Sequence, residues 1–384
     1  MSTSPNTKTN TGIKSGDLPL YKLIILGIQH TFTMFGATVL VPILTGLNIS
    51  VALFTAGVGT WFFHLVTKMK MPVFLGSSFA YIAPILLVAE QYGGLEYATG
   101  GIIIAGLMYL ILSVLVYFLG PKFIYDLFPP IVTGPIIMVI GLNLAPTAVD
   151  MAKDNWFLAG ICLITVIAIS IFAKGFLKVL PVLCGMIVGY VVAAIMGLVD
   201  FTPIAEAAWF GFPQFMFPKF SGAAISIIAP VAIVTMVEHI GDVLAVSATV
   251  GDDFVSDPGL HRTLLGDGVA TSIAAMLGGP ANTTYSENTG VLALTRVFDP
   301  WVMRIAACFA ILLSMIPKLG AIISTIPGPV IGGISIVLFG MIAAIGVRTV
   351  VENQVDFSKN RNLIIGAVIL VLGIGGAVFD FKFF

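Results

Sequence analysis

Charge is scarce in this sequence. Lys and Arg together number 18 and Asp and Glu 19, so only 10% of the 384 residues are charged, against about a quarter in soluble domains. The hydrophobic share is 58%, and the mean hydropathy is +1.07. These values exclude a soluble globular protein. The net charge of -1 leaves no basic surface for nucleic acid, so we expect no nucleic-acid partner.

Several catalytic and energy-coupling motifs are also missing. No Gly-Lys dipeptide occurs, so the sequence has no P-loop for ATP. The His-Glu-x-x-His zinc motif and the Gly-x-Ser-x-Gly nucleophile elbow are absent as well. Three cysteines, Cys162, Cys184 and Cys308, lie singly in apolar runs without metal-ligand spacing. We therefore expect no enzyme activity, no cofactor and no bound metal.

Thirteen apolar runs fill most of the chain, many of them close to the roughly 20 residues that cross a bilayer as a helix. Residues 1–19 are polar and lack the apolar core of a signal peptide, so we expect a cytoplasmic tail there. The runs lie at 20–44, 49–66, 74–89, 97–119, 127–146, 157–173, 179–199, 221–250, 260–278, 281–297, 300–317, 327–346 and 362–380.

The basic residues set the orientation of these runs. If each run crosses once from a cytoplasmic N-terminus, fourteen of the 18 basic residues lie in cytoplasmic loops, as the positive-inside rule requires. We therefore predict a multi-pass protein of the plasma (inner) membrane, surrounded by lipid. The wetter stretch 201–220 carries Trp209, Phe210 and Phe212, which suits an interfacial linker.

The second half of the sequence repeats the first. Gln29-His30 matches Glu238-His239, the segment 130–134 matches 329–333, and Gly141 and Gly340 keep the same offset. A repeat of seven spans, an odd number, gives two copies that cross the membrane in opposite directions. This is the plan of secondary transporters, with substrate bound near the midplane. The seventh run has no partner before Phe384, so we predict a further, fourteenth span in the complete protein.

Two segments at equivalent positions of the repeats predict breaks in the helices. Residues 71–78 and 278–284 are rich in Gly, Pro, Ser, Thr and Asn. Non-helical backbone is tolerated at membrane depth only where protein buries it or a cavity wets it. The helices that begin near Phe79 and Ser286 would direct free N–H groups into that cavity. A ligand with carbonyl oxygens fits such donors.

Three carboxylates lie at positions where charge is costly. Glu238 is far from either end of its run, Asp242 follows one helical turn later, and Glu287 begins another run. Carboxylates at such depth are functional by default, with a capping or structural hydrogen bond as the alternative. His30 and His239 match in the repeat, and a structural role competes with proton transfer for both.

The segment 287–296, ENTGVLALTR, resembles the signature of the nucleobase-ascorbate transporters, and Gln29-His30 resembles their first-span motif. The segments 76–81 and 282–285 are similar to the bacterial uracil permease branch of this family. The resemblance covers nearly the whole chain. It implies an all-α polytopic membrane fold of seven plus seven inverted spans, with short antiparallel strands in spans 3 and 10.

The resemblance also implies a division into core and gate domains and assembly as a homodimer. The implied segments are the core domain of the first repeat at 20–119, the gate domain of the first repeat at 120–200, the linker at 201–220, the core domain of the second repeat at 221–318, and the gate domain of the second repeat at 319–384, where span 14 is missing.

The activity that the resemblance implies is proton-coupled uptake of uracil by alternating access. Phe79 would pack on the ring and, with Ser286, offer main-chain N–H groups to its carbonyls, while Glu238 and Glu287 would accept its N–H groups and Tyr285 would line the site. The candidates for proton coupling are Glu238, Asp242, Glu287 and His30.

Two positions depart from the pattern of this branch. Close uracil permeases carry Gly where this chain has Ser286 and His where it has Asp242. Ser286 keeps its main-chain donor, and Asp242 keeps an ionisable group. Xanthine or another nucleobase is an alternative substrate. An anion exchanger or channel on the same architecture is the alternative of another class, and the carboxylate pair argues against it.

Overall fold

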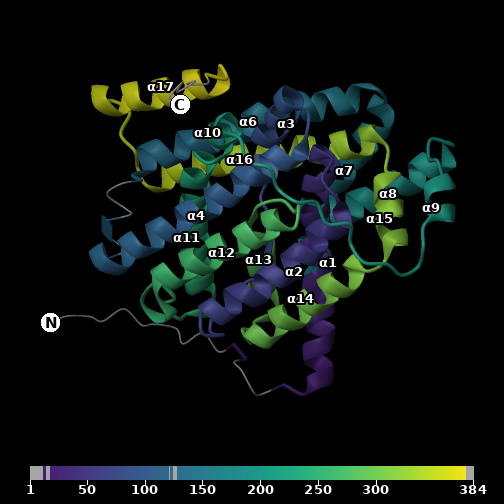
Figure 1. The fold of residues 1–384 in the computed structure, drawn as a ribbon, viewed down its shortest axis with the longest axis horizontal. Helices are drawn as coiled ribbons and strands as arrows, with labels where there is room; N and C mark the ends of the chain where they lie inside the picture. The colour runs from purple at the N-terminus through teal and green to yellow at the C-terminus, as the bar shows by residue number, and fades with distance from the viewer. Residues whose placement is uncertain (1–11, 14–17, 121, 124–127, 378–384) are drawn as a thin grey trace.

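The apolar runs form helices in the computed structural model of the chain, which describes residues 12–13, 18–120, 122–123 and 128–377 (Figure 1). Two short strands, β1 (Leu75–Ser77) and β2 (Asn282–Thr284), interrupt two of these runs. The helices are α1 (Leu20–Thr45), α2 (Ile49–Val66), η1 (Phe79–Tyr81), α3 (Ile82–Tyr92), α4 (Leu95–Leu119), α6 (Pro130–Lys153), α7 (Trp156–Phe172), η2 (Gly175–Val179), α8 (Pro181–Ile195), α9 (Thr202–Glu206), α10 (Gly222–Ile228), α11 (Val231–Val250), η3 (Val255–Gly259), α12 (Leu260–Met276), α13 (Ser286–Thr295), α14 (Pro300–Ser314), α15 (Pro317–Ser324), α16 (Gly328–Glu352) and α17 (Asn360–Ile374).

Local sequence explains where several of these helices begin and end. Asn48 caps α2, because its side chain accepts a hydrogen bond from the main-chain N–H of Val51 at 3.1 Å. Asn155 caps α7 in the same way. The helix α1 ends at Gly46, whose φ of +81° lies in the left-handed region that glycine enters without strain. Capping thus separates consecutive apolar runs without long loops.

Length and composition alone support a multi-pass membrane protein. Among the described residues, six helices are long and apolar enough to cross a membrane, or up to seven if the pair α14 and α15, bent by 80°, is one span. The remaining apolar runs give shorter helices. The two runs that contain strands show most clearly why a helix is shorter than its run. In them, β1 and β2 take part of the length that α3 and α13 would otherwise fill.

The two strands come from the two sequence repeats and pair with each other. They are antiparallel, with Leu75 opposite Thr284 and Ser77 opposite Asn282. Two flanking main-chain hydrogen bonds extend the pairing, from the Ser78 N–H to the Ala281 carbonyl and from the Tyr285 N–H to the Phe74 carbonyl, at 2.9 and 3.0 Å. The predicted broken segments and their short antiparallel strands are therefore confirmed.

Side chains from neighbouring helices pair with further main-chain polar groups in and beside this sheet. The Leu75 N–H donates to the Thr60 hydroxyl at 2.9 Å, and the His64 ring nitrogen Nε2 donates to the Val73 carbonyl at 2.8 Å. The Thr271 hydroxyl donates to the Asn282 carbonyl at 2.8 Å. These bonds let extended backbone lie inside the helix bundle, where an unpaired polar group costs free energy.

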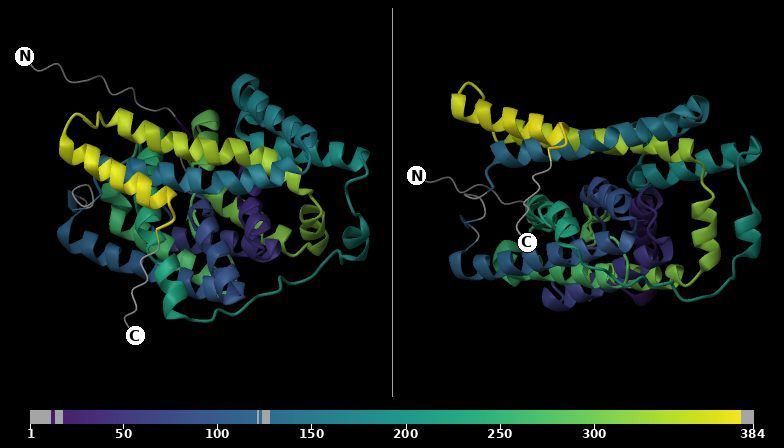
Figure 2. Two further views of the ribbon diagram at one scale, coloured as in Figure 1. Left: turned by 90° about the horizontal axis from the view of Figure 1, so that it is seen from above. Right: turned by 45° about the horizontal axis from the view of Figure 1, so that its top comes forward.

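The helices pack in two groups. In the first, α2 contacts α12 and α14, α12 contacts α4, and α1 contacts α14. In the second, α6 lies along α16, α17 packs on α6, and α7 packs on α16. The right panel of Figure 2 separates the layer of α6, α16 and α17 from the layer of α4 and α12. The division into core and gate domains stays a prediction.

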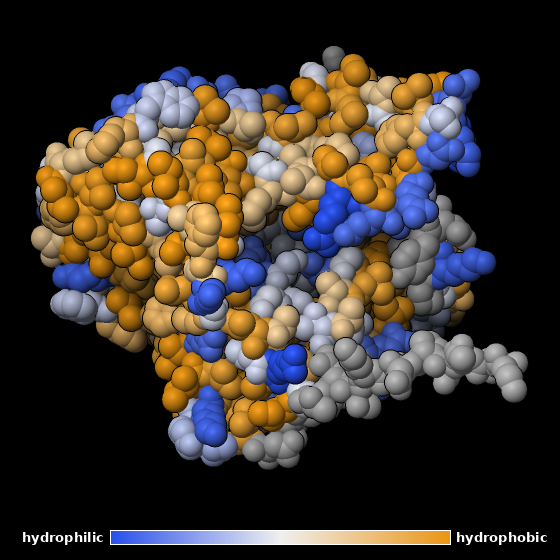
Figure 3. Space-filling view, turned by 180° about the vertical axis from the view of Figure 1, so that it is seen from behind, coloured by the Kyte–Doolittle hydropathy of each residue, from blue (hydrophilic) through white to orange (hydrophobic). Residues whose placement is uncertain are grey.

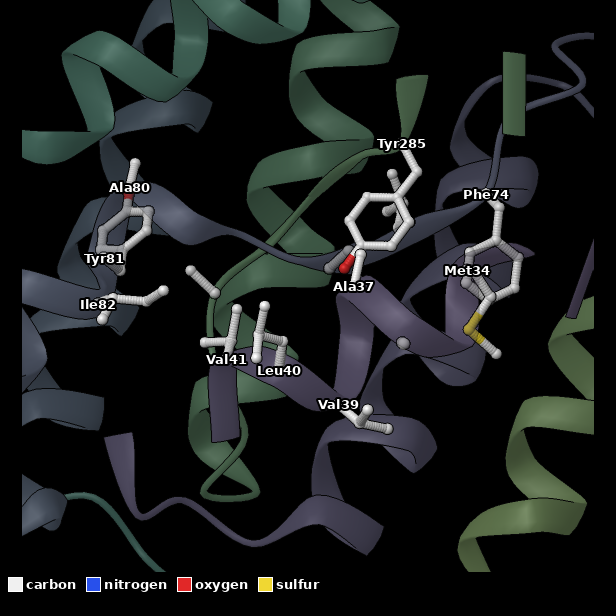
Figure 4. Packing of buried hydrophobic residues seen from close by; sticks show 14 of the residues in the cluster. Met34, Ala37, Val39, Leu40, Val41, Phe74, Ala80, Tyr81, Ile82 and Tyr285 are labelled. Atoms are coloured by element: carbon white, nitrogen blue, oxygen red, sulfur yellow. The ribbon is translucent and has the colours of Figure 1, made fainter. Parts of the chain in front are cut away.

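The buried core around α1 joins the first group to the strands. Met34 and Phe74 are fully buried and lie side by side, and the Tyr285 ring points toward α1 near Ala37 (Figure 4). Leu40 from α1 is equally buried. These side chains fix the sheet against α1 by apolar packing, in addition to its hydrogen bonds.

One residue of the predicted cytoplasmic tail is paired with the rest of the chain. Residue Ile13, within the predicted tail 1–19, pairs with the segment before α14, because its N–H donates to the Arg296 carbonyl and its carbonyl accepts from the Phe298 N–H, both at 2.9 Å. Ile13 is therefore held against the segment before α14, while the cytoplasmic location of the tail stays a prediction. Most of 1–19, including Lys8 and Lys14, and the end of the run 362–380 lie outside the described residues.

The linker 201–220 joins α8 to α10 and runs along the molecule from the end where α9 lies (Figure 1). It contains the short helix α9 and then irregular backbone, which the Gly211 N–H anchors to the Met315 carbonyl at 3.1 Å. Trp209, Phe210 and Phe212 are exposed, as an interfacial segment requires. Figure 3 shows the molecule from behind. Apolar side chains cover most of this face, and polar side chains gather around a central hollow.

We predict that Gly141→Ala destabilises the protein while Gly340→Ala does not. A methyl group at Gly141 would lie 2.5 Å from the Phe339 carbonyl oxygen and the Ala343 nitrogen of α16, whereas one at Gly340 meets nothing within 4 Å. Overpacking of this kind costs about 1 to 3 kcal/mol. The measurement is thermal unfolding in detergent. Equal melting temperatures for the two variants would contradict this account of how α6 and α16 pack.

Candidate functional site

A cavity of about 150 Å³ lies where the strand region faces α6 and α16. Cavities of about this volume bind a single six-membered ring such as benzene. The position at two broken helices is the one that the repeat predicts for a binding site. The lining residues are Phe79, Ala80, Ile137, Ile140, Val234, Glu238, Thr283, Thr284, Tyr285, Ser286, Glu287, Leu338, Met341, Ile342 and Ile345.

The polar side of the cavity carries two carboxylates. Glu238 comes from the middle of α11, and Glu287 comes from the first turn of α13. Both side chains are exposed to the cavity rather than packed in the core. An ionised carboxylate accepts hydrogen bonds and donates none, so this side of the cavity suits a molecule with N–H groups. The structure therefore brings these two predicted residues together.

Two helix starts supply donors to the same cavity. Phe79 begins η1 and Ser286 begins α13, and neither preceding residue, Ser78 or Tyr285, caps its helix with a side-chain hydrogen bond. The first N–H groups of a helix have no partner within the helix. Donors and carboxylate acceptors thus lie in one cavity, next to the half-buried ring of Phe79.

The opposite wall is apolar and comes from α6 and α16. Sequence reasoning missed these residues, although the matching segments 130–134 and 329–333, which begin the two helices, were a signal that could have found them. The wall closes the cavity against the other group of helices. Its members are Ile137, Ile140, Leu338, Met341, Ile342 and Ile345.

Asp242 lies behind the cavity lining and holds two of its residues. Its Oδ1 accepts a hydrogen bond from the Ser286 hydroxyl at 2.6 Å, and its Oδ2 accepts one from the Thr284 hydroxyl at 2.7 Å. The side chain links α11 to the end of β2 and the start of α13. The two positions that depart from the uracil permease pattern therefore contact each other.

His30 lies away from the lining residues. It is buried in α1, and Asn288 of α13 donates through Nδ2 to its ring nitrogen Nδ1 at 3.0 Å. Asn288 also contacts the His30 carbonyl oxygen at 3.3 Å. The pair joins the first span to the helix that carries Glu287. A coupling role for His30 stays a prediction, and the structure gives it a hydrogen-bonding partner that sequence reasoning did not identify.

His239 points to another side of α11 than Glu238, as its sequence position indicates. Its ring nitrogen Nδ1 lies 3.5 Å from Oδ2 of Asp267, and both side chains are completely buried. Sequence reasoning missed Asp267, which lies in α12, one of the least apolar of the predicted runs. The signal was present, because an acidic residue within a spanning segment is functional by default.

Tyr285 lines the cavity with its ring and anchors the sheet with its hydroxyl. The hydroxyl donates to the Ser77 carbonyl at 3.0 Å and accepts from the Thr38 hydroxyl at 3.3 Å. Because both bonds point toward β1 and α1, the phenol contributes no free donor to the cavity. Its predicted position at the site is found, and its polar atom has a structural function.

Comparisons with known proteins place this geometry in a family. A family model described as a permease family matches residues 21–381. The uracil permease of Bacillus caldolyticus is 48% identical over 92% of this chain and 85% of its own. The uracil permeases of Bacillus subtilis and Escherichia coli are 44% and 43% identical, over 96% and 94% of this chain and 89% and 86% of their own.

Solved structures with little sequence identity share the fold. The transmembrane domain of a cyanobacterium bicarbonate transporter, BicA, matches with a TM-score of 0.67 at 15% identity, over 93% of this chain and 96% of that chain. SLC26A9 matches with a TM-score of 0.71 at 11% identity, over 93% of this chain and 64% of that chain. The predicted fold of seven plus seven inverted spans is confirmed.

The fold and its central cavity define a membrane transporter of the inverted-repeat class. Within that class, the chain belongs to the permease family of nucleobase-ascorbate transporters, in the bacterial uracil permease branch.

We predict that Tyr285→Phe lowers stability and that Tyr117→Phe leaves it unchanged. The first change removes a buried hydroxyl that holds Ser77 and Thr38, at a cost of about 1 kcal/mol or more. The second removes a hydroxyl from a tyrosine that is 65% exposed on α4. Thermal unfolding in detergent measures both. A Tyr285→Phe variant as stable as Tyr117→Phe would show that the phenol does not anchor the sheet.

Proposed function

We propose that this chain is a uracil permease that carries uracil into the cell together with protons by alternating access. The observation that carries the proposal is the cavity in which Glu238, Glu287 and the starts of η1 and α13 meet. It lies at the pair of broken helices, where inverted-repeat transporters bind their substrates. The relatives from Bacillus caldolyticus and Bacillus subtilis are uracil permeases, and this chain aligns with 85% and 89% of their length.

The chemistry of the cavity matches that of uracil group by group. Uracil is a planar neutral ring with two N–H donors and two carbonyl acceptors. Glu238 and Glu287 accept from the N–H groups, while the main-chain N–H groups of Phe79 and Ser286 donate to the carbonyls. The Phe79 ring and the wall of α6 and α16 cover the faces of the ring. A site that pairs every polar group is selective, because an analogue without one leaves a protein group unpaired.

The volume of the cavity favours a pyrimidine over a purine. About 150 Å³ accommodates one six-membered ring, whereas xanthine has two fused rings. An inorganic anion would face Glu238 and Glu287 without an opposite charge among the lining residues, and like charges repel. Uracil is therefore the preferred substrate, with xanthine the second candidate and anions disfavoured.

The same carboxylates support proton coupling. Two carboxylates in one partly apolar cavity share protons as a coupled set, since both ionised together repel each other. We assign the coupling proton to Glu238, Glu287 and Asp242 together, with His30 a further candidate. Each proton that enters down an inside-negative potential of 100 mV contributes roughly 2.3 kcal/mol. That energy concentrates a neutral solute roughly 50-fold, at tenfold per 1.4 kcal/mol.

The rest of the proposal concerns the setting of the transporter. The chain lies in the plasma (inner) membrane with its N-terminus in the cytoplasm, surrounded by lipid, and assembles as a homodimer. It uses no cofactor, catalyses no reaction and couples to protons as its only ion. The surplus of basic residues in the predicted cytoplasmic loops supports the orientation.

We predict that Glu238→Gln weakens uracil binding about 5- to 150-fold. The amide replaces two acceptor oxygens with one acceptor and one donor, and an unsatisfied buried group costs about 1 to 3 kcal/mol. Glu90→Gln is the matched control, because Glu90 is exposed near the end of α3 and does not line the cavity. Isothermal titration in detergent measures both affinities. Wild-type affinity in Glu238→Gln would overturn the assignment of the site.

Transport itself is tested with labelled uracil in proteoliposomes. An inward proton gradient should drive accumulation, a protonophore should abolish it, and excess unlabelled uracil should compete more strongly than xanthine or bicarbonate. These results follow if a neutral ring and a proton move together. Accumulation that persists with the protonophore, or competition by bicarbonate alone, would contradict the proposed function.

A further inference from the structure

The hydroxyl of Ser286 lies at the cavity, and its proton is already used in a hydrogen bond within the protein. Ser286 is a lining residue, exposed to the cavity, at the first position of α13. Its hydroxyl donates to Oδ1 of Asp242 at 2.6 Å. A hydroxyl has one proton and two lone pairs. Because the hydroxyl proton points to Asp242, the Ser286 oxygen can only accept a hydrogen bond from a molecule in the cavity.

The surroundings of Asp242 fix the direction of the hydrogen bond from Ser286 to Asp242. Its side chain is 9% exposed, and its second oxygen, Oδ2, accepts from the Thr284 hydroxyl at 2.7 Å. Both carboxylate oxygens thus have a hydroxyl donor. Both hydroxyls donate to Asp242, and their direction is fixed while the carboxylate is ionised, because an ionised carboxylate donates nothing.

The other titratable groups that act on Asp242 cannot replace these donors. They are Glu238 on α11, Glu287 on α13 and Asp267 on α12. All three are acidic, and when ionised they accept hydrogen bonds as Asp242 does. Thr284 and Ser286 are therefore the donors to Asp242. Asp242 in turn determines that the Ser286 hydroxyl donates away from the cavity.

We propose that Asp242 makes the Ser286 hydroxyl an acceptor that shares one of the two ring N–H groups of the bound nucleobase with a cavity carboxylate, Glu238 or Glu287. Ser286 then offers two groups to the cavity, a main-chain N–H donor at the start of α13 and a side-chain acceptor. A donor beside an acceptor complements an amide edge of a ring, in which a carbonyl is next to an N–H group. Ser286 is a specificity-determining residue, and Asp242 is a positioning residue that acts through it.

This inference rests on the proposed function and adds the basis of ring selectivity. The test compares binding of uracil, 1-methyluracil and 3-methyluracil to purified protein by isothermal titration. Each methyl group removes one ring N–H donor. In Ser286→Ala, uracil should bind about fivefold more weakly, the loss of one hydrogen bond. One methyl analogue, the one that lacks the shared N–H, should bind as it does to the wild type.

The matched control is Ser324→Ala, which removes a hydroxyl that bonds only within α15 at an exposed position. It should leave all three affinities unchanged. Equal weakening of uracil and both analogues in Ser286→Ala would overturn the inference, because a structural effect on the cavity does not distinguish ring positions. An unchanged affinity for uracil would overturn it as well.

A double-mutant cycle tests whether Asp242 acts through Ser286. Asp242→Asn replaces one acceptor by an amide donor, so the two hydroxyl protons are no longer both held, and selectivity between uracil and the affected analogue should fall. In the Ser286→Ala background, the same change should have no further effect on that ratio. Additive effects would overturn the positioning role. If the wild type binds no uracil at all, the proposed function fails instead, so the two failures are distinguishable.

Discussion

The constraint on which the structure depends is that main-chain polar groups inside the membrane must be paired. Breaking two helices at equivalent places of the repeats exposes such groups, and the antiparallel pairing of β1 with β2 satisfies part of them. Thr60, His64 and Thr271 satisfy others from neighbouring helices. The starts of η1 and α13 have no side-chain cap, and Phe79 and Ser286 at these starts line the cavity. The binding donors are therefore a consequence of how the chain solves a folding problem.

The position of the cavity follows from the same arrangement. The end of β2, η1, α11 and the start of α13 form one side, which is dense in polar contacts, while α6 and α16 present aliphatic side chains on the other. An apolar wall can slide past a polar site with little loss, because packing is non-directional, whereas the hydrogen bonds around Asp242 and Asn288 are directional. Alternating access by movement between these two sides leaves the binding groups in their places, and it suits a transporter that closes around a neutral ring.

The sequence could predict those features that arise from composition and spacing along the chain. The strands were readable from the Gly, Pro, Ser, Thr and Asn content of two equivalent segments, and Glu238 and Glu287 from the cost of charge at their depth. Contacts that depend on the rotation of one helix against another were not readable, as with Asn288 on His30, Asp267 on His239 and the wall of α6 and α16. Ile13 was missed for another reason, since a polar tail shows no pattern that indicates pairing with Val297.

The two departures from the family pattern are physically one feature. Ser286 places a hydroxyl at the cavity, and Asp242 places a carboxylate behind it. Without Asp242 the Ser286 hydroxyl would lose this partner, and without Ser286 the buried Asp242 carboxylate would keep the Thr284 bond on one oxygen only, which is costly. Together they form a hydrogen bond of 2.6 Å, and Thr284 satisfies the remaining oxygen. Each residue therefore gives the other a hydrogen-bond partner. The pair also leaves an acceptor oxygen at a position where a glycine would offer only a main-chain donor.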